Sequence, residues 1–514
     1  MAWYGEARVN VPLDRDRPVP LARQIQAHFE RLIADGLLAP GVKLPATREL
    51  AQSLRVNRAT VALAYEELVA AGLARAHVGQ GTFVAGGPSG RQASGVAPGP
   101  APIDWTALFS RSARTVAADE ERQRALGTPN GAGTTISFAG GMPDSALFPT
   151  DAFRRVLNAV VREEGEALLQ YSPVGGYAPL RRYLAGYLLR FGVEARAEEI
   201  LIVNGSQQGF DLIARTLVDP GDLVAIEQPT YTGAMQSFRS FGARLVAVEW
   251  EETGPRADVF ERLCERQAPK LFYCQPSAHN PTGLTIEPEV GRRLLAAAMR
   301  HQVPIVEDGF DGNLYYGQRP GTPLKAADRG GVVIHIGTFS RMLFPGLRLG
   351  WLVAPPAVVD RLHAAKQLAD LHTSALLQAA VHRFCERRLL ERHVTRVTAE
   401  YARRRTLLLT ALRRRMPEGV TWTEPQGGFS LLLTLPPGLT AARLLPAALE
   451  HGVGFTPGPA FFLDGAGERT LRLTFSSVAA GRIDEGVRRL ADTIKAVQRQ
   501  PRPQRADYQM VPVI

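Results

Sequence analysis

The sequence predicts a multidomain protein, with a small N-terminal helix-turn-helix domain of the α+β class followed by a large C-terminal α/β domain. The chain has 514 residues, more than one ordinary domain holds. Residues 85–103 (AGGPSGRQASGVAPGPAPI) have the Gly-, Pro- and Ala-rich composition of a linker. Short helical patterns precede this stretch. Short apolar runs that alternate with helical patterns follow it, which is typical of a buried parallel sheet covered by helices.

These patterns divide the chain into four segments. We expect a small domain over residues 1–84, a flexible linker over 85–133, a large domain over 134–498 and a disordered tail over 499–514. A weakly amphipathic stretch from Trp105 to Arg124 predicts a helix that extends the linker.

The composition is that of a soluble globular protein, with 45% hydrophobic and 21% charged residues. No run approaches ~18 uninterrupted apolar residues, so we expect no membrane span. The first residues also lack a signal-peptide pattern. The three cysteines, Cys264, Cys274 and Cys385, are too few for a disulfide framework and lack the spacing of a metal site. We therefore expect a cytoplasmic protein without a bound metal.

The net charge of +10 does not by itself predict DNA binding. Residues 1–84 hold ten Lys or Arg and eight Asp or Glu, a net charge of only +2. Only five of the 60 basic residues are lysines, so an arginine in place of a lysine also fits the general composition of the chain. A nucleic-acid partner must therefore be inferred from the pattern and placement of residues.

The small domain has the pattern of a helix followed by a helix-turn-helix. Apolar residues at helical spacing predict the first helix over Leu21–Gly36. Thr47 is expected to cap a second helix over Arg48–Leu54, and Asn57 to cap a third over Arg58–Ala71. In a helix-turn-helix the last of these helices enters the DNA major groove with its N-terminal residues against base edges.

The segment 44–85 (LPATRELAQSLRVNRATVALAYEELVAAGLARAHVGQGTFVA) resembles the winged-helix domain of the GntR family of bacterial regulators. Within it, residues 79–82 (GQGT) indicate the tip of a two-stranded wing. The resemblance implies a winged helix-turn-helix that binds a double-stranded DNA operator. The alternative is a three-helix module for protein contact. The residues that the resemblance places at or near the DNA are Arg48, Asn57, Arg58, Thr60 and, in the wing, Gly81.

Several motifs of the large domain, taken in their order, resemble fold-type I aminotransferases, which use pyridoxal 5'-phosphate (PLP). Behind a GntR-like domain they resemble the MocR-type subfamily of GntR regulators over nearly the whole chain. Residues 338–350 (TFSRMLFPGLRLG) resemble the loop whose lysine condenses with the cofactor aldehyde, and Arg341 stands at the position of that lysine. A guanidinium stays protonated and is a poor nucleophile, so it cannot form that bond.

The resemblance also implies a phosphate site. Gly205, Ser206 and Gln207 follow a predicted strand and open a helix, where backbone N–H groups and the Ser206 hydroxyl would bind the cofactor phosphate. Ser340 and Arg348 flank position 341 and would add a hydroxyl and a guanidinium to the same anion.

The remaining cofactor contacts follow from the same resemblance. Tyr231 would stack on the ring, Asn280 would bond the ring hydroxyl, and Asp308 would pair with the protonated ring nitrogen. Arg472 would hold the carboxylate of a substrate or effector, and Tyr171 would reach the site from a partner subunit. Each motif alone also fits a helix cap, a turn, an ion pair or a core residue, so the assignment depends on their joint order.

Phe310 is a second departure from the family, which usually has a tyrosine there whose hydroxyl bonds the ring oxygen. Phe310 and Arg341 both lie at the covalent end of the cofactor, whereas the expected phosphate and ring contacts remain. We therefore expect noncovalent binding of PLP or another anionic effector, with no catalytic residue and negligible transamination. Lys325 and Lys366 are the nearest lysines in sequence, and no motif places either at the aldehyde.

The leading hypothesis is a homodimeric transcription regulator whose aminotransferase-like domain dimerises and senses a small anionic or amino-acid-like effector. Two alternatives stay open. One is an active PLP-dependent aminotransferase that tolerates Arg341. The other is an effector-independent DNA-binding protein whose large domain is only a dimerisation scaffold.

Overall fold

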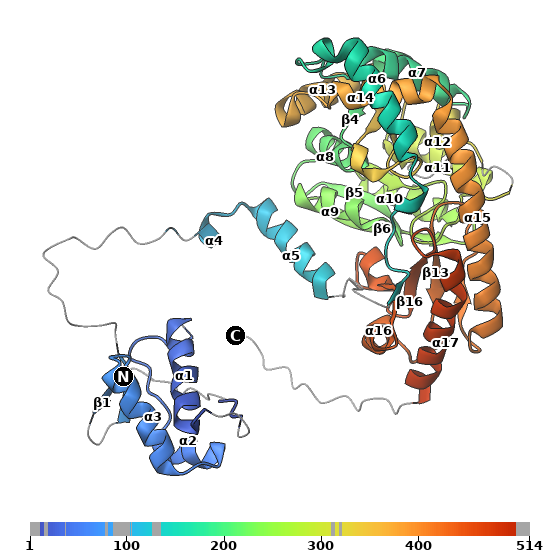
Figure 1. Cartoon of the computed structure of the whole chain (residues 1–514). Coiled ribbons are helices and arrows are strands. Elements are labelled where there is room, and N and C mark those ends of the chain that lie inside the picture. The colour runs from blue at the N-terminus through green and yellow to red at the C-terminus, as the bar shows by residue number, and fades with distance from the viewer. Residues whose placement is uncertain are drawn as a thin grey trace, which may run out of the picture. The chain divides into compact units, whose positions relative to one another are not determined.

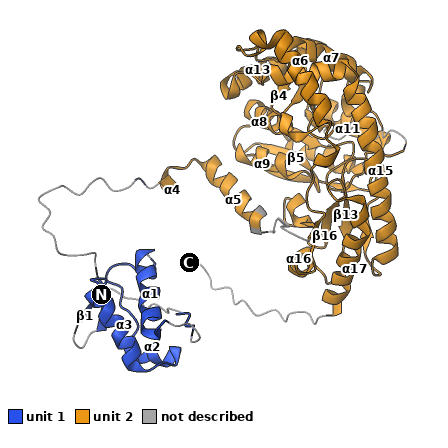
Figure 2. Ribbon diagram, in the orientation of Figure 1, with its two compact units in different colours: residues 1–104 blue, residues 105–514 orange. Residues whose placement is uncertain are grey.

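The chain forms two compact units, residues 1–104 and 105–514 (Figure 2). The computed structural model describes residues 11–14, 19–35, 37–77, 81–85, 103, 105–125, 135–309, 314–317 and 321–499. Phe310, residues 79 and 80 of the expected wing tip and the expected tail beyond Arg499 lie outside the described residues.

The first unit confirms the predicted winged helix-turn-helix (Figure 1). Its core is apolar, and within it the ring of Phe29 meets that of Tyr65 edge to face at 5.6 Å. Asn57 caps the third helix as predicted, because its side-chain oxygen accepts a hydrogen bond from the Ala59 N–H at 3.0 Å. The elements are α1 (Leu21–Ala34), α2 (Thr47–Leu54), α3 (Arg58–Ala70) and the antiparallel strands β1 (Ala74–His77) and β2 (Gly81–Val84).

The start of α2 differs from the sequence prediction by one residue. Ala46 is the N-cap, and Thr47, the expected cap, lies in the first turn. The physical reason is that the Ala46 carbonyl already accepts the Leu50 N–H at 2.9 Å, so the helical hydrogen bonds start at Ala46.

The second unit is built on an eight-stranded sheet with the strand order β4-β11-β10-β9-β8-β5-β6-β7. Alternating residues of β5 belong to different cores: Val224 and Ile226 pack with α8, α9 and α13, whereas Ala225 packs with α10 and α11. Helices therefore cover both faces. The strands are β4 (Ile200–Val203), β5 (Leu223–Gln228), β6 (Arg244–Glu251), β7 (Gly254–Pro255), β8 (Leu271–Cys274), β9 (Ile305–Asp308), β10 (Val333–Thr338) and β11 (Gly350–Val353). The helices named here are α8 (Ser206–Leu217), α9 (Thr232–Ser240), α10 (Ala257–Gln267), α11 (Pro288–His301) and α13 (Pro356–Asp370).

The sheet is mixed, which corrects the prediction of a parallel one. The five strands β10, β9, β8, β5 and β6 run parallel to their neighbours in this series. β11 follows β10 after one short connection that holds the 3-10 turn η3 (Pro345–Leu347), and so returns beside it in the antiparallel direction. β4 then pairs antiparallel with β11, and β7 with β6. Apolar runs alone do not distinguish these directions.

A smaller sheet and long helices complete the second unit (Figure 1). The antiparallel strands β12 (Thr421–Trp422), β13 (Ser430–Thr434), β16 (Thr470–Thr474) and β15 (Thr456–Pro457) form the sheet, and β14 (Val453–Gly454) pairs with β3 (Ile136–Ser137). The remaining helices are α6 (Thr150–Leu168), α7 (Ala178–Leu189), α12 (Leu324–Ala327), α14 (Ala375–Glu386), α15 (Leu389–Arg415), α16 (Ala441–Glu450) and α17 (Ile483–Arg499). The other 3-10 turns are η1 (Ser145–Leu147), η2 (Ala197–Glu199), η4 (Gly458–Phe461) and η5 (Ala480–Arg482).

The expected linker helix forms, and it packs on the second unit. It is divided into α4 (Trp105–Leu108) and α5 (Arg111–Ala125). Asp119 of α5 forms an ion pair with Arg239 of α9 at 3.6 Å, so α5 contacts the large unit and belongs to its compact part. Among the described residues, no helix combines the length and apolar character that a bilayer crossing needs.

Candidate functional site

A cavity of about 160 Å³ opens where β9 and β10 end and α8 begins. The structure brings seven of the residues expected at the cofactor together on its wall: Ser206, Gln207, Tyr231, Asp308, Ser340, Arg341 and Arg348. The sequence analysis did not single out the other lining residues, Met142, Pro143, Thr338 and Pro345.

One end of the cavity has the donors of an anion site. α8 begins at Ser206, so its first backbone N–H groups have no partner within the helix and face outward from its start. Gly205 precedes it with φ at 81°, and a Cβ there would lie 2.7 Å from Arg348 Nη2. Glycine thus leaves the space for this guanidinium, which donates to the Asn204 carbonyl at 3.0 Å. The Thr338 hydroxyl donates to Ser340 Oγ at 3.0 Å and orients it.

Asp308 and Tyr231 also lie on the cavity wall. Asp308 is the last residue of β9 and is buried, and the Tyr273 hydroxyl of β8 donates to its Oδ2 at 2.9 Å. Burial raises the pKa of the Tyr231 hydroxyl, and the positive charge of Arg341 opposes this rise. Sequence reasoning missed Tyr273, because its apolar run indicates only a buried strand and not which strand lies beside it.

Asn280 and Arg472 do not line the cavity but bond each other beside it. Asn280 Oδ1 accepts from Arg472 Nη1 at 3.0 Å. The other acceptors of the Arg472 guanidinium are also neutral, namely the Ala139 carbonyl at 2.9 Å and Thr456 Oγ1 at 3.3 Å, and the Phe461 ring lies 4.9 Å away. Burial, and then the charge of Arg341, lower the pKa of Arg472 to about 10.

The guanidinium groups of Arg341 and Arg472 both lie beside Gly141. A Cβ at Gly141 would lie 3.7 Å from Arg472 Nη1 and 3.9 Å from Arg341 Nη1. Arg341 also lies over the Phe429 ring at 5.5 Å. Arg341 and Arg348 therefore place two guanidinium groups on the cavity wall, the Arg472 guanidinium lies beside it, and Asp308 is the carboxylate among the described lining residues. This balance of charge favours an anionic ligand.

The residues expected at DNA lie in the first unit, on two helices and the wing. Arg48 of α2, Asn57 and Arg58 are exposed, whereas Thr60, one turn into α3, is half-buried. Gly81 opens β2 with φ at 111°, and a Cβ there would lie 2.9 Å from Lys43 Cε, so the Lys43 side chain lies against the wing. Sequence reasoning missed Lys43, because it precedes the helix-turn-helix motif.

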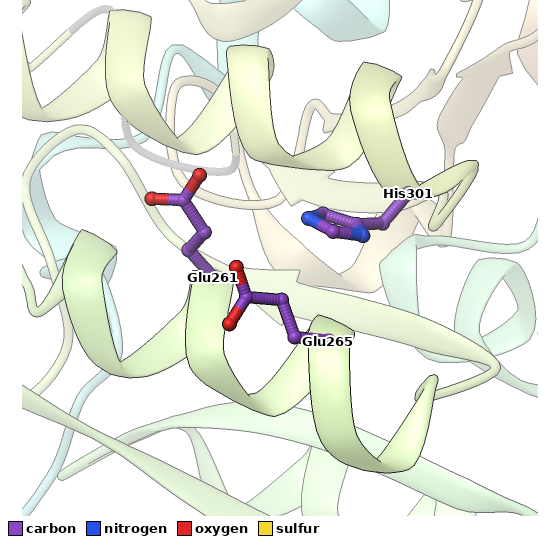
Figure 3. Close-up of side chains that lie close together, drawn as sticks. All are labelled: Glu261, Glu265 and His301. Atoms are coloured by element: carbon purple, nitrogen blue, oxygen red, sulfur yellow. The ribbon is translucent and has the colours of Figure 1, made fainter.

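A third group of residues, away from the cavity, has the ligand types of a metal site. Glu261 and Glu265 of α10 and His301 at the end of α11 present atoms within 4.8 Å of one another (Figure 3). Arg300 forms an ion pair with Glu261 and so neutralises part of this charge. We interpret the group as a surface ion-pair cluster.

Comparison with known proteins decides the family. Residues 144–490 match the model of aminotransferase class I and II, and residues 21–84 match that of bacterial regulatory proteins of the gntR family. The probable rhizopine catabolism regulatory protein MocR of Rhizobium meliloti is 32% identical over 491 residues, 95% of this chain and 96% of that protein. This chain is a MocR-type regulator of the GntR family.

The second unit of this MocR-type regulator is similar to aminotransferases of the same fold. The 2-aminoadipate transaminase of Thermus thermophilus is 39% identical over 399 residues, 77% of this chain and 98% of the enzyme. A crystal structure of LysN, an α-aminoadipate aminotransferase from Thermus thermophilus complexed with N-(5'-phosphopyridoxyl)-L-leucine, superposes with a TM-score of 0.71 and 37% identity, covering 77% of this chain and 99% of that one. The fold-type I domain implies PLP binding in the family.

None of the five lysines of this regulator lines the cavity, and the structure describes all five. Lys366 is buried and donates to Asp370 at 2.7 Å and to Gln208 Oε1 at 3.1 Å, and burial lowers its pKa. Lys325 donates to Asp328 at 2.9 Å and to the Val333 carbonyl at 2.8 Å. The two lysines that lie nearest to position 341 in the sequence therefore hold other parts of the fold together.

We predict that Gly205→Ala lowers the free energy of unfolding of the large unit by about 1–3 kcal/mol, because alanine is strained at this φ and its Cβ meets Arg348. Urea unfolding followed by circular dichroism measures the change. Gly186→Ala is the matched control. Gly186 lies in α7 with open space at its Cβ position, so the same substitution should be neutral or stabilise by up to about 1 kcal/mol. Equal effects of the two substitutions would contradict the assigned role of Gly205.

Proposed function

We propose that this DNA-binding regulator uses its aminotransferase domain as a receptor, which binds PLP or a related phosphorylated anion noncovalently and does not transfer amino groups. The observation that carries the proposal is the wall of the cavity, where Arg341 lies among the expected cofactor residues and no lysine is present. We assign to Arg341 the position of the lysine that carries the cofactor in the enzymes of this fold.

The residues of the cavity suit the three polar parts of PLP. The start of α8, Ser206, Ser340 and Arg348 would hold the phosphate. The Asp308 carboxylate, oriented by Tyr273, would pair with a protonated ring nitrogen. Tyr231 would contact the ring face. When bound, PLP supplies an aldehyde that accepts amines and a ring that withdraws electrons.

Arg341 changes what this pocket can do with such a ligand. Its guanidinium can donate hydrogen bonds and attract an anion, but it cannot serve as the amine nucleophile or as the base that moves a proton. Loss of general acid–base catalysis alone costs roughly 10²–10⁴-fold in rate, and loss of the nucleophile adds to it. The hydrogen bonds and ion pairs that would hold the phosphate and the ring do not depend on a covalent bond to a lysine, so this loss leaves them in place.

Arg472 is suited to hold the carboxylate of an amino-acid-like effector. It bonds only neutral acceptors among the described residues, so no carboxylate in that part of the chain pairs with its charge. A ligand carboxylate would supply that balance and gain a charge-assisted bond. The effector class that follows is a phosphorylated pyridoxyl compound, with or without an attached amino acid.

We further propose a homodimer in which the exposed Tyr171 reaches the cavity of the partner subunit. Tyr171 is 79% exposed, and the edge of its ring lies against His372 at 6.0 Å between ring centres. Leu368, which lies four residues before His372 in the sequence, is 91% exposed. Large apolar side chains at this exposure favour a protein contact. Two winged helices per dimer would then bind two half-sites of an operator.

An active aminotransferase is the second candidate, because enzymes with that activity are 39% identical to the second unit. The substitution Arg341→Lys separates the two. We predict that it restores covalent attachment of PLP, since the other lining residues already suit the cofactor. Peptide mass spectrometry after borohydride reduction should find the pyridoxyl group on residue 341 of the variant. Arg341→Gln, which removes the charge without adding an amine, is the control and should stay unlabelled. A folded Arg341→Lys variant without label would contradict the proposed fit of the pocket.

For the DNA-binding unit, we predict that Arg58→Ala weakens operator binding by about 1–3 kcal/mol and relaxes sequence preference at one base pair, because Arg58 is exposed at the start of α3. Fluorescence anisotropy with a duplex that the protein selects from a random pool measures both effects. Arg31→Ala removes the same charge from α1 and should lower affinity less and equally for all sequences. If Arg58→Ala kept the affinity and the preference of the wild type, Arg58 would not contact a base.

A further inference from the structure

The helix that carries the chain into the large unit is attached by one buried carboxylate. Among the described side chains of α5, Asp119 is buried, Thr115 is half-buried and the others are exposed. Val116, for instance, leaves 48% of its surface exposed. Because little apolar surface is removed from water, the polar contacts of Asp119 decide whether α5 stays in place.

Asp119 meets one arginine on its own helix and one on α9. Its Oδ1 accepts from Arg122 at 3.3 Å and forms an ion pair with Arg239 at 3.6 Å. Only 9% of the Asp119 side chain and 22% of the Arg239 side chain are exposed, so water screens this pair less than it screens a surface ion pair. A cavity of about 410 Å³ remains between α5, α9 and residues 459–465, so the contact is loosely filled.

Arg239 also holds the loop at residues 459–465, which contacts Arg472 beside the proposed effector site. Its Nη2 donates to the Leu463 carbonyl at 3.2 Å, and the Leu463 N–H donates to Gln228 Oε1 at 2.8 Å. Phe461 belongs to the same loop, and its ring lies 4.9 Å from the Arg472 guanidinium. The Phe461 carbonyl accepts the Thr230 N–H at 2.9 Å.

The other end of α9 reaches the cavity wall. α9 is capped by Tyr231, a lining residue, and its Ser237 accepts a bond from Gln207, another lining residue, at 2.7 Å. Arg239 lies in the last turn of this nine-residue helix. A short helix moves as one body, so a shift of Tyr231 at its start moves Arg239 at its end.

We propose that the Asp119–Arg239 ion pair is the joint through which occupancy of the cavity changes the attachment of α5, and through it the placement of the DNA-binding unit. The inference rests on the proposed function, because it needs a ligand in the cavity. Both routes from the cavity, α9 and the loop at residues 459–465, meet at Arg239. Residues 86–104 connect α4 and α5 to the winged helix, so release or capture of α5 changes how far the winged helix can reach.

Asp119→Asn in the full-length protein tests the joint, because it keeps the size of the side chain and removes its charge. Hydrogen exchange of residues 111–125 is measured with and without pyridoxamine 5'-phosphate, together with affinity for the selected duplex. In the wild type, the ligand should change the exchange rate of α5 and the DNA affinity together. In Asp119→Asn, α5 amides should exchange about fivefold faster or more without ligand, and the ligand should no longer change either quantity.

Two controls make the result specific. Glu120→Gln removes a neighbouring charge that pairs with Arg124 on the surface of the same helix, and it should behave as the wild type. Arg239→Gln should loosen α5 as Asp119→Asn does, and the double variant should lose no more of its attachment than either single variant, because both substitutions remove the same Asp119–Arg239 ion pair.

The outcomes separate the two proposals. If the wild type and Asp119→Asn bind pyridoxamine 5'-phosphate equally and the ligand-dependent changes persist in the variant, the joint is overturned and the proposed receptor function stands. If neither PLP nor pyridoxamine 5'-phosphate binds the wild type, the receptor function fails, and the joint fails with it. Unequal effects of Asp119→Asn and Arg239→Gln on α5 exchange would also overturn the joint.

Discussion

The permanent charge of Arg341 constrains what the cavity of the large unit can do. Its guanidinium lines this cavity together with that of Arg348. The Arg472 guanidinium lies beside the cavity near Gly141, and Asp308 is the carboxylate among the described lining residues. Such a site offers an anion several donors, and it offers an aldehyde no neutral amine. In the proposed receptor, this pocket holds the family's cofactor without the amine that would bind it covalently.

The fold explains why these charges gather in one place. The parallel strands β9 and β10 bring Asp308 and the segment at residues 338–341 to one edge of the sheet, and the start of α8 faces the same edge. Ligands of open α/β sheets bind at this edge, outside the carboxyl ends of the strands. Gly205 then leaves the room that the Arg348 guanidinium occupies.

Much of this arrangement follows from the sequence, because the polar motifs stand directly after strands. Seven of the residues expected at the cofactor line the cavity, and Asn57 caps α3 as predicted. Contacts between segments far apart in the chain could not be predicted. The antiparallel return of β11, the bond from Tyr273 to Asp308, and the docking of α5 on α9 depend on which elements become neighbours. Periodicity and composition indicate which residues are buried, and they do not indicate which helices and strands lie beside one another. The roles of Asn280 and Phe310 stay predictions, since Asn280 bonds Arg472 beside the cavity and Phe310 lies outside the described residues.

Equilibrium dialysis of the purified wild-type protein against PLP, with borohydride added to half of the loaded sample before extensive dialysis, tests the central claim most directly. The account predicts saturable binding that dialysis reverses in both halves, and no mass added to any lysine. A pyridoxyl group that remains on a lysine after reduction would contradict it, because the cavity would then hold an amine that reacts with the aldehyde.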